Sequence, residues 1–285
     1  MKFDNFISGE KIQNLCDCCI YNKDYLQSYP NIFYNCKKII LIDGELDNEK
    51  IQIINNSKSF FIKTDFLEYF YKIILPNIKK KFILVTHNSD LSSGPINEIQ
   101  NNIYNNELLV YWYGQNMIPC EKGICIPIGL ENSQYKGSDG NFCISNKTNE
   151  KNNLLYFNFN VNTNLLRKEF RQSLLNNGFC ENNNRYWNNY ILELSTYKFC
   201  ISPPGNGIDC HRTWESIYVG CIPIVLKTKE NLMYYYFKNL PILFVDDYNV
   251  ITVEFLNEQY EIIKNKNIDI DSIGLDYWKN KIENF

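Results

Sequence analysis

The sequence has no long hydrophobic run. Its first residues, MKFDNFISGEKIQNLCDCC, lack an apolar stretch of signal-peptide length. No window approaches the roughly 20 apolar residues that a membrane-spanning helix needs. We therefore expect a soluble, cytoplasmic protein without a membrane span. Alanine is also absent, while Asn, Ile, Lys and Tyr are abundant. We attribute this bias to an AT-rich viral or microbial genome rather than to function.

Charge of one sign is not in excess either. The chain has 29 Lys and Arg residues against 32 Asp and Glu residues, which gives a net charge of -3. Proteins that bind nucleic acids or anionic membranes usually carry a pronounced basic excess. We therefore expect no nucleic-acid partner, although a local basic pocket for phosphates is compatible with this balance. The oligomeric state is unknown from the sequence.

Metal-binding patterns are incomplete. The 11 cysteines include Cys16 and Cys19 at C-x-x-C spacing. A zinc site needs a second pair at matching spacing, and none is present, so we interpret the cysteines as thiols. Asp269 and Asp271 form the D-x-D pattern of metal-dependent transferases, but they lie near the C-terminus instead of after an early strand. We expect no metal site.

Length and hydrophobic patterning predict two α/β domains. The chain has 285 residues, 45% of them hydrophobic, which suits two domains of roughly 140 residues each. Short apolar runs typical of buried parallel strands alternate with helical segments. The expected strands are Ile39–Ile42, Phe60–Lys63, Phe82–Thr86, Leu108–Tyr111, Ile124–Ile128, Leu154–Phe157, Lys198–Ile201, Ile222–Leu226 and Ile242–Val245. The expected helices are Asp65–Leu75, Leu165–Leu175, Tyr186–Leu194, His211–Val219, a short one near Leu232–Phe237 and one over about Val253–Ile263.

The boundary between the domains is expected in the polar, weakly periodic segment Lys136–Asn153. We place the domains at residues 1–145 and 146–285, with the C-terminal helix packing back on the first. Asp65 is a candidate N-cap, Pro76 is expected to end the helix that follows it, and Gly178 to end another. Two such domains predict a cleft, with ligands outside the carboxyl ends of the strands.

The segment Ser202–Glu215, SPPGNGIDCHRTWE, follows one of these strands. Its first prolines stop the strand, and Gly205, Asn206 and Gly207 then offer a stretch with little bulk that is able to take positive φ. Asp209 is a candidate N-cap for the helix that starts near Cys210 or His211. A Gly-rich turn that runs into a helix N-terminus presents backbone N–H groups and a positive dipole end, which suits a diphosphate.

We expect Trp214 and its apolar neighbours on one side of that helix and His211, Arg212 and Glu215 together on another. Arg212 would neutralise a leaving diphosphate, and Glu215 would accept hydrogen bonds from ribose hydroxyls. An ordinary turn with an Arg212–Glu215 surface pair is the alternative. The Walker motif and G-x-G-x-x-G are both absent, so the markers of ATP and NAD sites are missing.

Further candidates lie in neighbouring loops and helices. Asn158 follows the strand Leu154–Phe157, and Arg167 and Arg171 lie four residues apart on the next helix. We assign all three to the side of the site that would hold the diphosphate, with a solvated basic face as the alternative for the arginines.

A reaction that deprotonates a hydroxyl needs a general base, and the first domain offers candidates for one. Asp90 is our first choice and His87 the second, because both follow a predicted strand. Loop capping is the alternative for Asp90, and a structural hydrogen bond is the alternative for His87. Gln115 and Asn116 end the next strand and either bind acceptor hydroxyls or cap backbone groups. Asp43 and Glu45 are a third base candidate, for which a polar loop is the favoured interpretation.

SPPGNGIDCHRTWESIYVGCIPIV resembles the C-terminal motif of the exostosin-like glycosyltransferases, especially the branch that includes the ribitol xylosyltransferase and its microbial and viral relatives. The resemblance extends over most of the chain from about Phe82 to Val245. The shorter matching segments are Thr86–Asp90 (THNSD), Trp112–Asn116 (WYGQN), Ile126–Asn132 (IPIGLEN), Leu154–Phe159 and Thr163–Arg171.

The resemblance implies a GT-B architecture of two Rossmann-like domains, with the donor in the C-terminal one and the acceptor mainly in the N-terminal one. It implies a nucleotide-diphosphate sugar donor, usually a UDP-sugar, a glycan acceptor, no cofactor or essential metal, and usually inversion. By position, Gly205, Asn206, Gly207, His211, Arg212 and Glu215 become donor-site residues. Golgi members carry an N-terminal membrane anchor that this sequence lacks, so their compartment and acceptors are not carried over.

Two alternatives stay open. One is another nucleotide-dependent α/β enzyme, such as an NAD(P)-dependent one. The other is a non-catalytic module that binds nucleotides or carbohydrates.

Overall fold

The computed structural model describes residues 2, 4–29, 35–42, 46–133, 139–183, 186–229, 232–266, 268 and 270–285. The candidates Asp43, Glu45 and Asp269 lie outside these residues. The chain forms two compact units. The first unit contains the described residues of Ile7–Ile128, Asn132, Ser133 and Ser272–Phe285. The second unit contains the N-terminal residues up to Phe6, the short segment Gly129–Glu131 and the described residues from 139 to Asp271.

The first unit is built on a six-stranded parallel sheet with the strand order β2-β1-β3-β4-β5-β6. The strands are β1 (Cys18–Tyr21), β2 (Ile39–Leu41), β3 (Ser59–Lys63), β4 (Phe82–His87), β5 (Leu109–Gly114) and β6 (Gly123–Cys125). The helices are α1 (Gly9–Gln13), α2 (Lys23–Ser28), α3 (Asn48–Asn56), α4 (Leu67–Tyr69), α5 (Glu98–Tyr104) and α12 (Leu275–Glu283).

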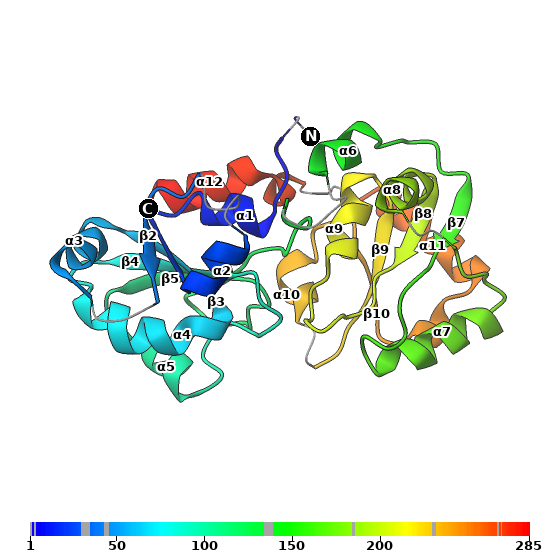
Figure 1. Ribbon diagram of the computed structural model, residues 1–285. Coiled ribbons are helices and arrows are strands. Elements are labelled where there is room, and N and C mark those ends of the chain that lie inside the picture. The colour runs from blue at the N-terminus through cyan, green and yellow to red at the C-terminus, as the bar shows by residue number, and fades with distance from the viewer. Residues whose placement is uncertain are drawn as a thin grey trace. The chain divides into compact units, whose positions relative to one another are not determined.

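Both faces of this sheet are covered, which explains the continuous apolar runs of its strands. On one face Phe61, Ile83 and Val85 pack with α1 and α12. On the other face the rings of Phe60, Phe70 and Phe82 meet at centroid distances of 5.9 to 6.1 Å. Figure 1 shows α4 and α5 on one side of the sheet and α1 and α12 on the other.

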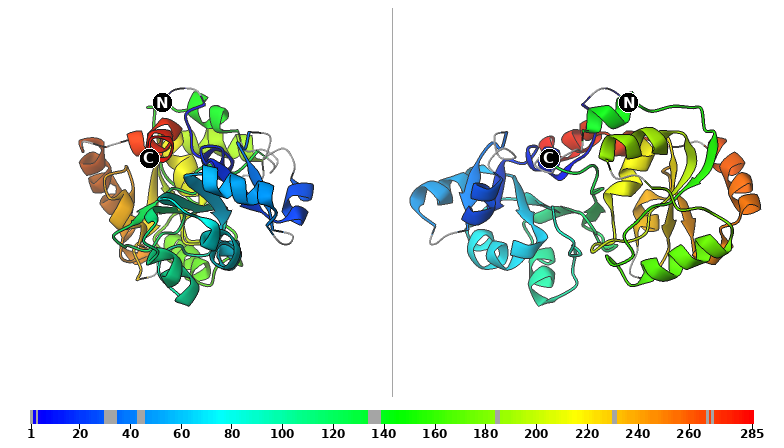
Figure 2. Two further views of the ribbon diagram at one scale, coloured as in Figure 1. Left: turned by 90° about the vertical axis from the view of Figure 1, so that its left-hand side faces the viewer. Right: turned by 45° about the vertical axis from the view of Figure 1, so that its right-hand side comes forward.

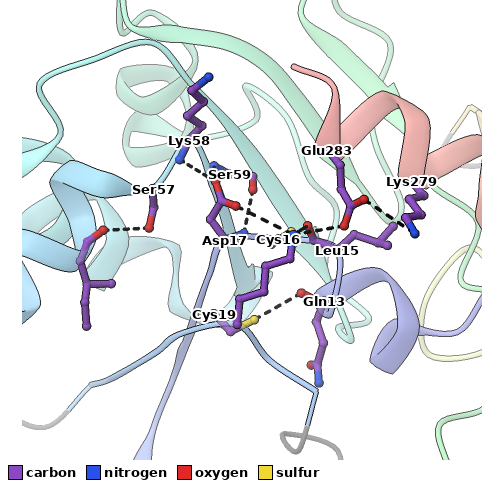
Figure 3. A network of polar contacts seen from close by, with 12 residues as sticks. Gln13, Leu15, Cys16, Asp17, Cys19, Ser57, Lys58, Ser59, Lys279 and Glu283 are labelled. Carbon is purple, nitrogen blue, oxygen red and sulfur yellow. Dashed lines mark hydrogen bonds and ion pairs between the residues drawn. The ribbon is translucent and has the colours of Figure 1, made fainter.

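Helix α12 joins the first unit although it comes last in the chain. Trp278 and Ile282 of this helix are buried in the same core as Tyr113 of β5. At the amino ends of the strands, Lys37 Nζ lies 3.1 Å from Glu283 Oε1 and 4.0 Å from Asp17 Oδ1. Asp17 in turn accepts hydrogen bonds from the backbone N–H groups that begin β3 (Figure 3).

The strand β1 was not expected from the sequence. It lies between β2 and β3, and all four of its residues are buried. Half of the strand is cysteine, and we considered those residues only as thiols. They are indeed free thiols, as are all 11 cysteines. Burial raises the pKa of the Cys18 thiol to about 12. In this strand cysteine acts as a small hydrophobic residue.

The second unit contains a four-stranded parallel sheet with the order β10-β9-β8-β7. The strands are β7 (Asn153–Tyr156), β8 (Tyr197–Ile201), β9 (Ile222–Leu226) and β10 (Leu243–Val245). The helices are α6 (Gly140–Ser145), α7 (Leu166–Asn176), α8 (Trp187–Ser195), α9 (His211–Tyr218), α10 (Met233–Phe237) and α11 (Val253–Lys264). Each strand and helix predicted for this part of the chain is present within a few residues of its expected bounds.

Helices cover both faces of the second sheet as well. Phe170 and Leu174 of α7 and Leu256 and Ile263 of α11 pack on one face. Helices α8 and α9 lie against the other face, where Trp214 of α9 meets Phe237 of α10 at a ring distance of 5.1 Å. Figure 2 shows α7 and α8 on opposite sides of this sheet.

One predicted helix is irregular. The stretch expected as the helix Asp65–Leu75 consists of a 3-10 turn, Thr64–Phe66, then α4, a π-helical segment, Phe70–Ile74, and a second 3-10 turn, Leu75–Asn77. Asp65 is not its N-cap, because that position is Lys63, which makes no side-chain capping bond. The helical stretch does not stop before Pro76. Proline is tolerated there because it occupies one of the first positions of the last 3-10 turn.

The expected connection Lys136–Asn153 is partly helical. Within it, α6 begins after Asp139, whose carboxylate accepts a hydrogen bond from the Asn141 N–H, and buries Cys143. Phe142 lies 5.9 Å from the Trp187 ring. The few apolar residues of this polar segment pack against the second unit. Gly129–Glu131 already belong to the second unit, Asn132 and Ser133 to the first, and the described residues from 139 to Asp271 to the second again. The domain limits at residue 145 stay a prediction.

The helix stop at Gly178 is confirmed. Gly178 has φ +84 and donates to the Leu175 carbonyl, and the Phe179 N–H donates to the Leu174 carbonyl. This pair of bonds is a Schellman motif, in which glycine accepts the left-handed conformation without strain.

Candidate functional site

In the second unit, the candidate residues gather at the carboxyl ends of β7 and β8. These strands are hydrogen-bonded neighbours, so the loops that follow them emerge side by side. Asn158 lies in the first loop, and Gly205, Asn206 and Gly207 lie in the second. Arg212 lies on helix α9, which follows the second loop. The structure thus brings together residues that are more than 40 positions apart in the chain.

The loop after β8 is braced by α7. Arg167 donates from Nε to the Pro204 carbonyl at 2.8 Å and from Nη2 to the Pro203 carbonyl at 3.3 Å. Asn164 donates from Nδ2 to the Gly205 carbonyl at 3.0 Å. These bonds turn three carbonyl oxygens toward α7. Arg167 therefore shapes the loop directly, and Asn164 is a site residue that the sequence analysis missed.

The glycines of this loop do not use positive φ. Among the described residues, the glycines at positive φ are Gly94, Gly129, Gly178 and Gly220. A Cβ on Gly205 would meet its nearest atom, Arg167 Nη2, at 3.7 Å, which is ordinary contact. The Gly205–Gly207 turn is therefore able to take positive φ but does not use it. The room left by the missing side chain remains available to a ligand.

The helix α9 begins differently from the prediction. Its N-cap residue is Cys210, which makes no side-chain capping bond, so the expected N-cap at Asp209 was wrong. The buried Asp209 carboxylate instead accepts hydrogen bonds from Trp214 Nε1 at 2.8 and 3.0 Å. Trp214 requires a partner for its indole N–H because its ring is buried in the core. The N-cap side chain thus makes no capping bond at the start of α9.

Arg212 lies in the half-buried space between the β7 loop and α8. Its Nη1 donates to the Asn158 carbonyl, and its guanidinium lies 5.6 Å from the centre of the Tyr190 ring. Its Nε is buried and has no hydrogen-bond partner among the described residues. Burial acts to lower the pKa of Arg212, but Tyr190, the nearby thiols and Glu215 outweigh it, so that the pKa is raised. Arg212 is therefore a fixed positive charge.

Glu215 does not share an exposed face with His211. Only 7% of it is exposed, and its two oxygens accept hydrogen bonds from Trp187 Nε1 and from the Tyr190 hydroxyl, both at 2.9 Å. The expected common face fails because α8 covers this side of α9. Burial raises the pKa of Tyr190 well above its usual range, so its hydroxyl stays a donor. A ribose at this site would find the Glu215 carboxylate already hydrogen-bonded.

His211 faces a segment that the sequence analysis did not connect with the donor. Its Nδ1 lies 2.8 Å from the Gly129 carbonyl, and its Nε2 lies 3.3 Å from Glu131 Oε2. Gly129 and Glu131 lie in the segment with the sequence IPIGLEN and belong to the second unit. The only feature of the sequence that pointed to this segment was its similarity to the exostosin-like glycosyltransferases.

Arg171 points elsewhere. Its Nε and Nη2 both lie 2.7 Å from Glu181 Oε2, and both side chains are partly exposed. This pair differs from Arg167, four residues earlier, which bonds only to backbone carbonyls and packs on the Phe159 ring at 5.8 Å. The structure therefore separates the two arginines that the sequence placed on one face.

In the first unit, His87 ends β4 and is fully buried. Its Nε2 lies 3.0 Å from the Pro127 carbonyl and its Nδ1 lies 3.3 Å from Asn88 Oδ1. Asn88 has φ +58 and its Oδ1 accepts a hydrogen bond from Asn132 Nδ2 at 3.1 Å. This arrangement resembles a structural brace at the end of the strand more than a base that must reach a substrate.

Asp90 lies on the loop that follows, and its side chain is exposed. The loop is held by Asn116, whose Nδ2 donates to the backbone carbonyls of Ser89 and Asp90 at 3.4 and 3.3 Å. Asn116 therefore caps backbone groups, which is one of its two expected roles. Gln115 is buried, and its Oε1 has no hydrogen-bond partner among the described residues.

The described residues contain no group of three or more His, Cys, Asp or Glu side chains arranged to hold a metal ion. Within the same part of the chain, no helix combines the length and the apolar character needed to cross a bilayer.

A comparison with protein families matches the Exostosin GT47 domain over residues 85–261. The match contains the end of β4, the loops after β7 and β8, and helix α9. No curated protein matches the chain. The two parallel sheets with helices on both faces are consistent with a GT-B-like α/β glycosyltransferase fold.

Proposed function

The chain belongs to the exostosin GT47 family of glycosyltransferases; from this premise we propose that it transfers a sugar from a UDP-sugar to a hydroxyl of a glycan acceptor. The observation that carries the proposal is the environment of Arg212. This fixed cation has a buried Nε without a hydrogen-bond partner among the described residues, and it lies one residue after the start of α9. A cation beside a helix N-terminus suits a diphosphate leaving group.

In this proposal the Gly205–Gly207 turn admits the diphosphate, and Arg212 with the first N–H groups of α9 stabilises the charge that develops as it departs. The same donor site includes Asn158, Asn206 and Glu215. Glu215 contributes by fixing α8 at one side of the site. Arg171 has the weakest support among the donor candidates, because Glu181 already engages its guanidinium.

We propose Asp90 as the base that takes the proton of the acceptor hydroxyl. It is exposed, its loop is braced, and its carboxylate has no hydrogen bond or ion pair among the described residues. The buried His87 has weaker support. A base that acts directly on the acceptor leads to inversion at the anomeric carbon, which NMR of the product would detect.

Positive charge from Arg212 and the helix N-terminus replaces a metal in this proposal. We expect EDTA to leave the transfer rate unchanged after the protein has been freed of trace metals. A rate that requires added Mn²⁺ or Mg²⁺ would contradict this part of the proposal.

The decisive experiment is isothermal titration of the wild type and Arg212→Ala with UDP and UDP-sugars. We expect the wild type to bind UDP and the variant to bind it much more weakly. Arg171→Ala is the matched control, because it also removes one arginine from the second unit. If the wild type binds no nucleotide diphosphate, the proposed donor site is wrong.

A further inference from the structure

The loop after β8 has few backbone N–H groups to offer to a ligand. The Ser202 N–H donates to a carbonyl of the neighbouring strand β9 at 2.9 Å. The two prolines that follow have no N–H. The Gly205 N–H donates to the Gly207 carbonyl at 3.0 Å. The Asn206 N–H is therefore the first donor of this loop that has no hydrogen-bond partner among the described residues.

The direction of this N–H group follows from the peptide bond that contains it. The described chain has no cis peptide bond, so the Gly205 carbonyl and the Asn206 N–H point in opposite directions. The carbonyl accepts a hydrogen bond from Asn164 Nδ2 at 3.0 Å, on the side of the loop where α7 begins. The N–H therefore points away from α7. Asn206 is exposed, so a ligand can reach this donor.

The side chain of Asn164 is held at both of its polar atoms. Its Oδ1 accepts a hydrogen bond from the Leu166 N–H at 3.1 Å, while its Nδ2 donates to the Gly205 carbonyl. A carboxamide supplies one acceptor oxygen and two donor hydrogens, and these two bonds require one of each kind. Asn164 thus connects the first turn of α7 to the Gly-rich turn after β8.

Arg167 holds the same loop one turn further along the helix. Its Nε and Nη2 donate to the two proline carbonyls before Gly205, and its Nη1 donates to the Asn160 carbonyl at 3.1 Å in the loop after β7. The guanidinium also packs on the Phe159 ring at 5.8 Å. Asn164 and Arg167 therefore keep three consecutive carbonyl oxygens of the loop on one side, which leaves the Asn206 N–H on the other.

The surroundings of this N–H suit a phosphate oxygen. Gly205 has no side chain, and a Cβ built there would meet its nearest atom at 3.7 Å, so the preceding residue does not block the approach. Backbone N–H groups form short, strong hydrogen bonds with anionic oxygens. A donor that is oriented before the ligand arrives costs no reorganisation on binding.

We propose that Asn164 is a positioning residue of the donor site: by holding the Gly205 carbonyl, it orients the Asn206 N–H toward a phosphate oxygen of the nucleotide. The inference rests on the proposed function. Asn164 itself makes no contact with the donor in this arrangement. The ligand of the oriented N–H is the diphosphate, and the base and the ribose bind elsewhere in the site.

The variant that tests this role is Asn164→Ser. Serine keeps an oxygen that can accept the Leu166 N–H, as serine does at helix N-termini, but it is too short to reach the Gly205 carbonyl. We expect its affinity for UDP to fall by about tenfold, because an oriented hydrogen bond to a charged group is lost. Thermal melting shows whether the second unit is intact.

The matched control is Asn162→Ser. It removes a carboxamide from the same segment, and the Asn162 side chain has no hydrogen-bond partner among the described residues. We expect this variant to bind UDP with the wild-type affinity. Equal losses of affinity in the two variants would contradict a specific role of Asn164.

A spectroscopic readout reports on the peptide bond itself. The sequence contains a glycine followed by an asparagine twice, at Asn141 and at Asn206. Protein labelled with carbon-13 at the glycine carbonyls and with nitrogen-15 at asparagine therefore gives two backbone carbonyl–amide correlation peaks, with Asn141 as the internal reference. Without nucleotide, the Gly205 carbonyl signal should move upfield in Asn164→Ser, because the carbonyl loses a hydrogen bond. It should not move in Asn162→Ser.

Nucleotide titrations then test the N–H group. In the wild type, saturating UDP should move the Asn206 amide proton downfield, because the N–H gains a charged acceptor, whereas uridine, which has no phosphate, should leave it unmoved. This test uses the wild type and does not depend on the stability of a variant. In Asn164→Ser the shift at saturation should be smaller.

Three results overturn the inference: an Asn206 proton that UDP leaves unmoved or that uridine moves equally, a Gly205 carbonyl signal that does not depend on Asn164, or wild-type affinity for UDP in Asn164→Ser. If the wild type binds no UDP while the carbonyl signal does depend on Asn164, the proposed function is contradicted and the contact between Asn164 and the turn stands.

Discussion

The loops at the carboxyl ends of the two sheets differ in charge and in how their side chains are used. In the second unit, the loop after β8 is surrounded by Arg167, Arg212 and His211, and each of these bonds to at least one backbone carbonyl. In the first unit, the loop after β4 carries the exposed Asp90 and is held by the neutral amide of Asn116. Preorganised cations suit the stabilisation of a leaving group, whereas a base needs an accessible carboxylate.

The largest expected effect tests the anionic loop. Asp90→Asn should lower the transfer rate by about 10² to 10⁴-fold, the usual contribution of general base catalysis. UDP affinity and thermal stability should stay at their wild-type values, because the side chain is exposed and the loop is held by backbone bonds. The measurement is kcat with UDP-sugar and acceptor, together with titration by UDP.

Asp65→Asn is the control, since it removes an exposed carboxylate that follows the neighbouring strand β3 and pairs with Lys63 at 3.9 Å. If Asp90→Asn transfers sugar at the wild-type rate, Asp90 is not the base.

The next effect tests the cationic loop. Arg212→Lys keeps a charge but loses the fork that spans the Asn158 carbonyl and the Tyr190 ring. We expect the transfer rate to fall by about 10² to 10³-fold, as when one transition-state donor is removed. Arg171→Lys should change the rate little. Equal losses in the two variants would show that general charge, and not the position of Arg212, matters.

A pair of glycine substitutions separates folding from ligand access. A Cβ on Gly9 would lie 1.7 Å from Asn88 Oδ1 and 2.8 Å from His87 Nδ1, both of which are held by further hydrogen bonds. Gly9→Ala should therefore destabilise the first unit by about 1–3 kcal/mol. Gly205→Ala should leave the melting temperature unchanged and weaken UDP binding. A stable Gly9→Ala protein, or unaltered UDP affinity in Gly205→Ala, would contradict the respective assignment.

The smallest effect concerns alkaline pH. Burial raises the pKa of Tyr113 in the first unit to about 12, and it also raises the pKa values of Tyr156, Tyr190 and Tyr248 in the second. Unfolded tyrosines ionise near pH 10. The stability linked to these groups is therefore fully present below about pH 10 and is lost as the pH rises toward the folded values. Denaturant unfolding measured from pH 8 to pH 11.5 should show this loss.

Tyr113→Phe should reduce the pH slope for the first unit, since it removes one such ionisation. A free energy of unfolding that stays constant across this range would contradict the role of burial.

Hydrophobic patterning predicted most of the elements. Parallel strands that are buried on both faces are nearly all apolar, so each can be recognised from its own residues. It failed where one residue type plays two roles. The strand β1 was hidden by Cys18 and Cys19, and the helix α6 by its polar surroundings. The turn at Gly178 was predictable because its hydrogen bonds are local.

The candidate site was predictable as a set of residues but not as a set of contacts. Asp209 was expected to cap α9, but the buried indole of Trp214 competes for the same carboxylate. Glu215 was expected on the side of the helix that His211 occupies, but the packing of α8 buries it. No pattern in the sequence states which helix will cover a given face.

The sequence by itself determined the alternation of strands and helices, the Gly-rich turn that leads into α9, and the family resemblance, because each of these depends on neighbouring residues. Only the tertiary structure decided the partners of the ionisable groups. Glu131 meets His211 across 80 positions of sequence, and Arg167 meets Pro203 across 36. Contacts of that kind depend on how elements pack, and packing is set by the whole chain.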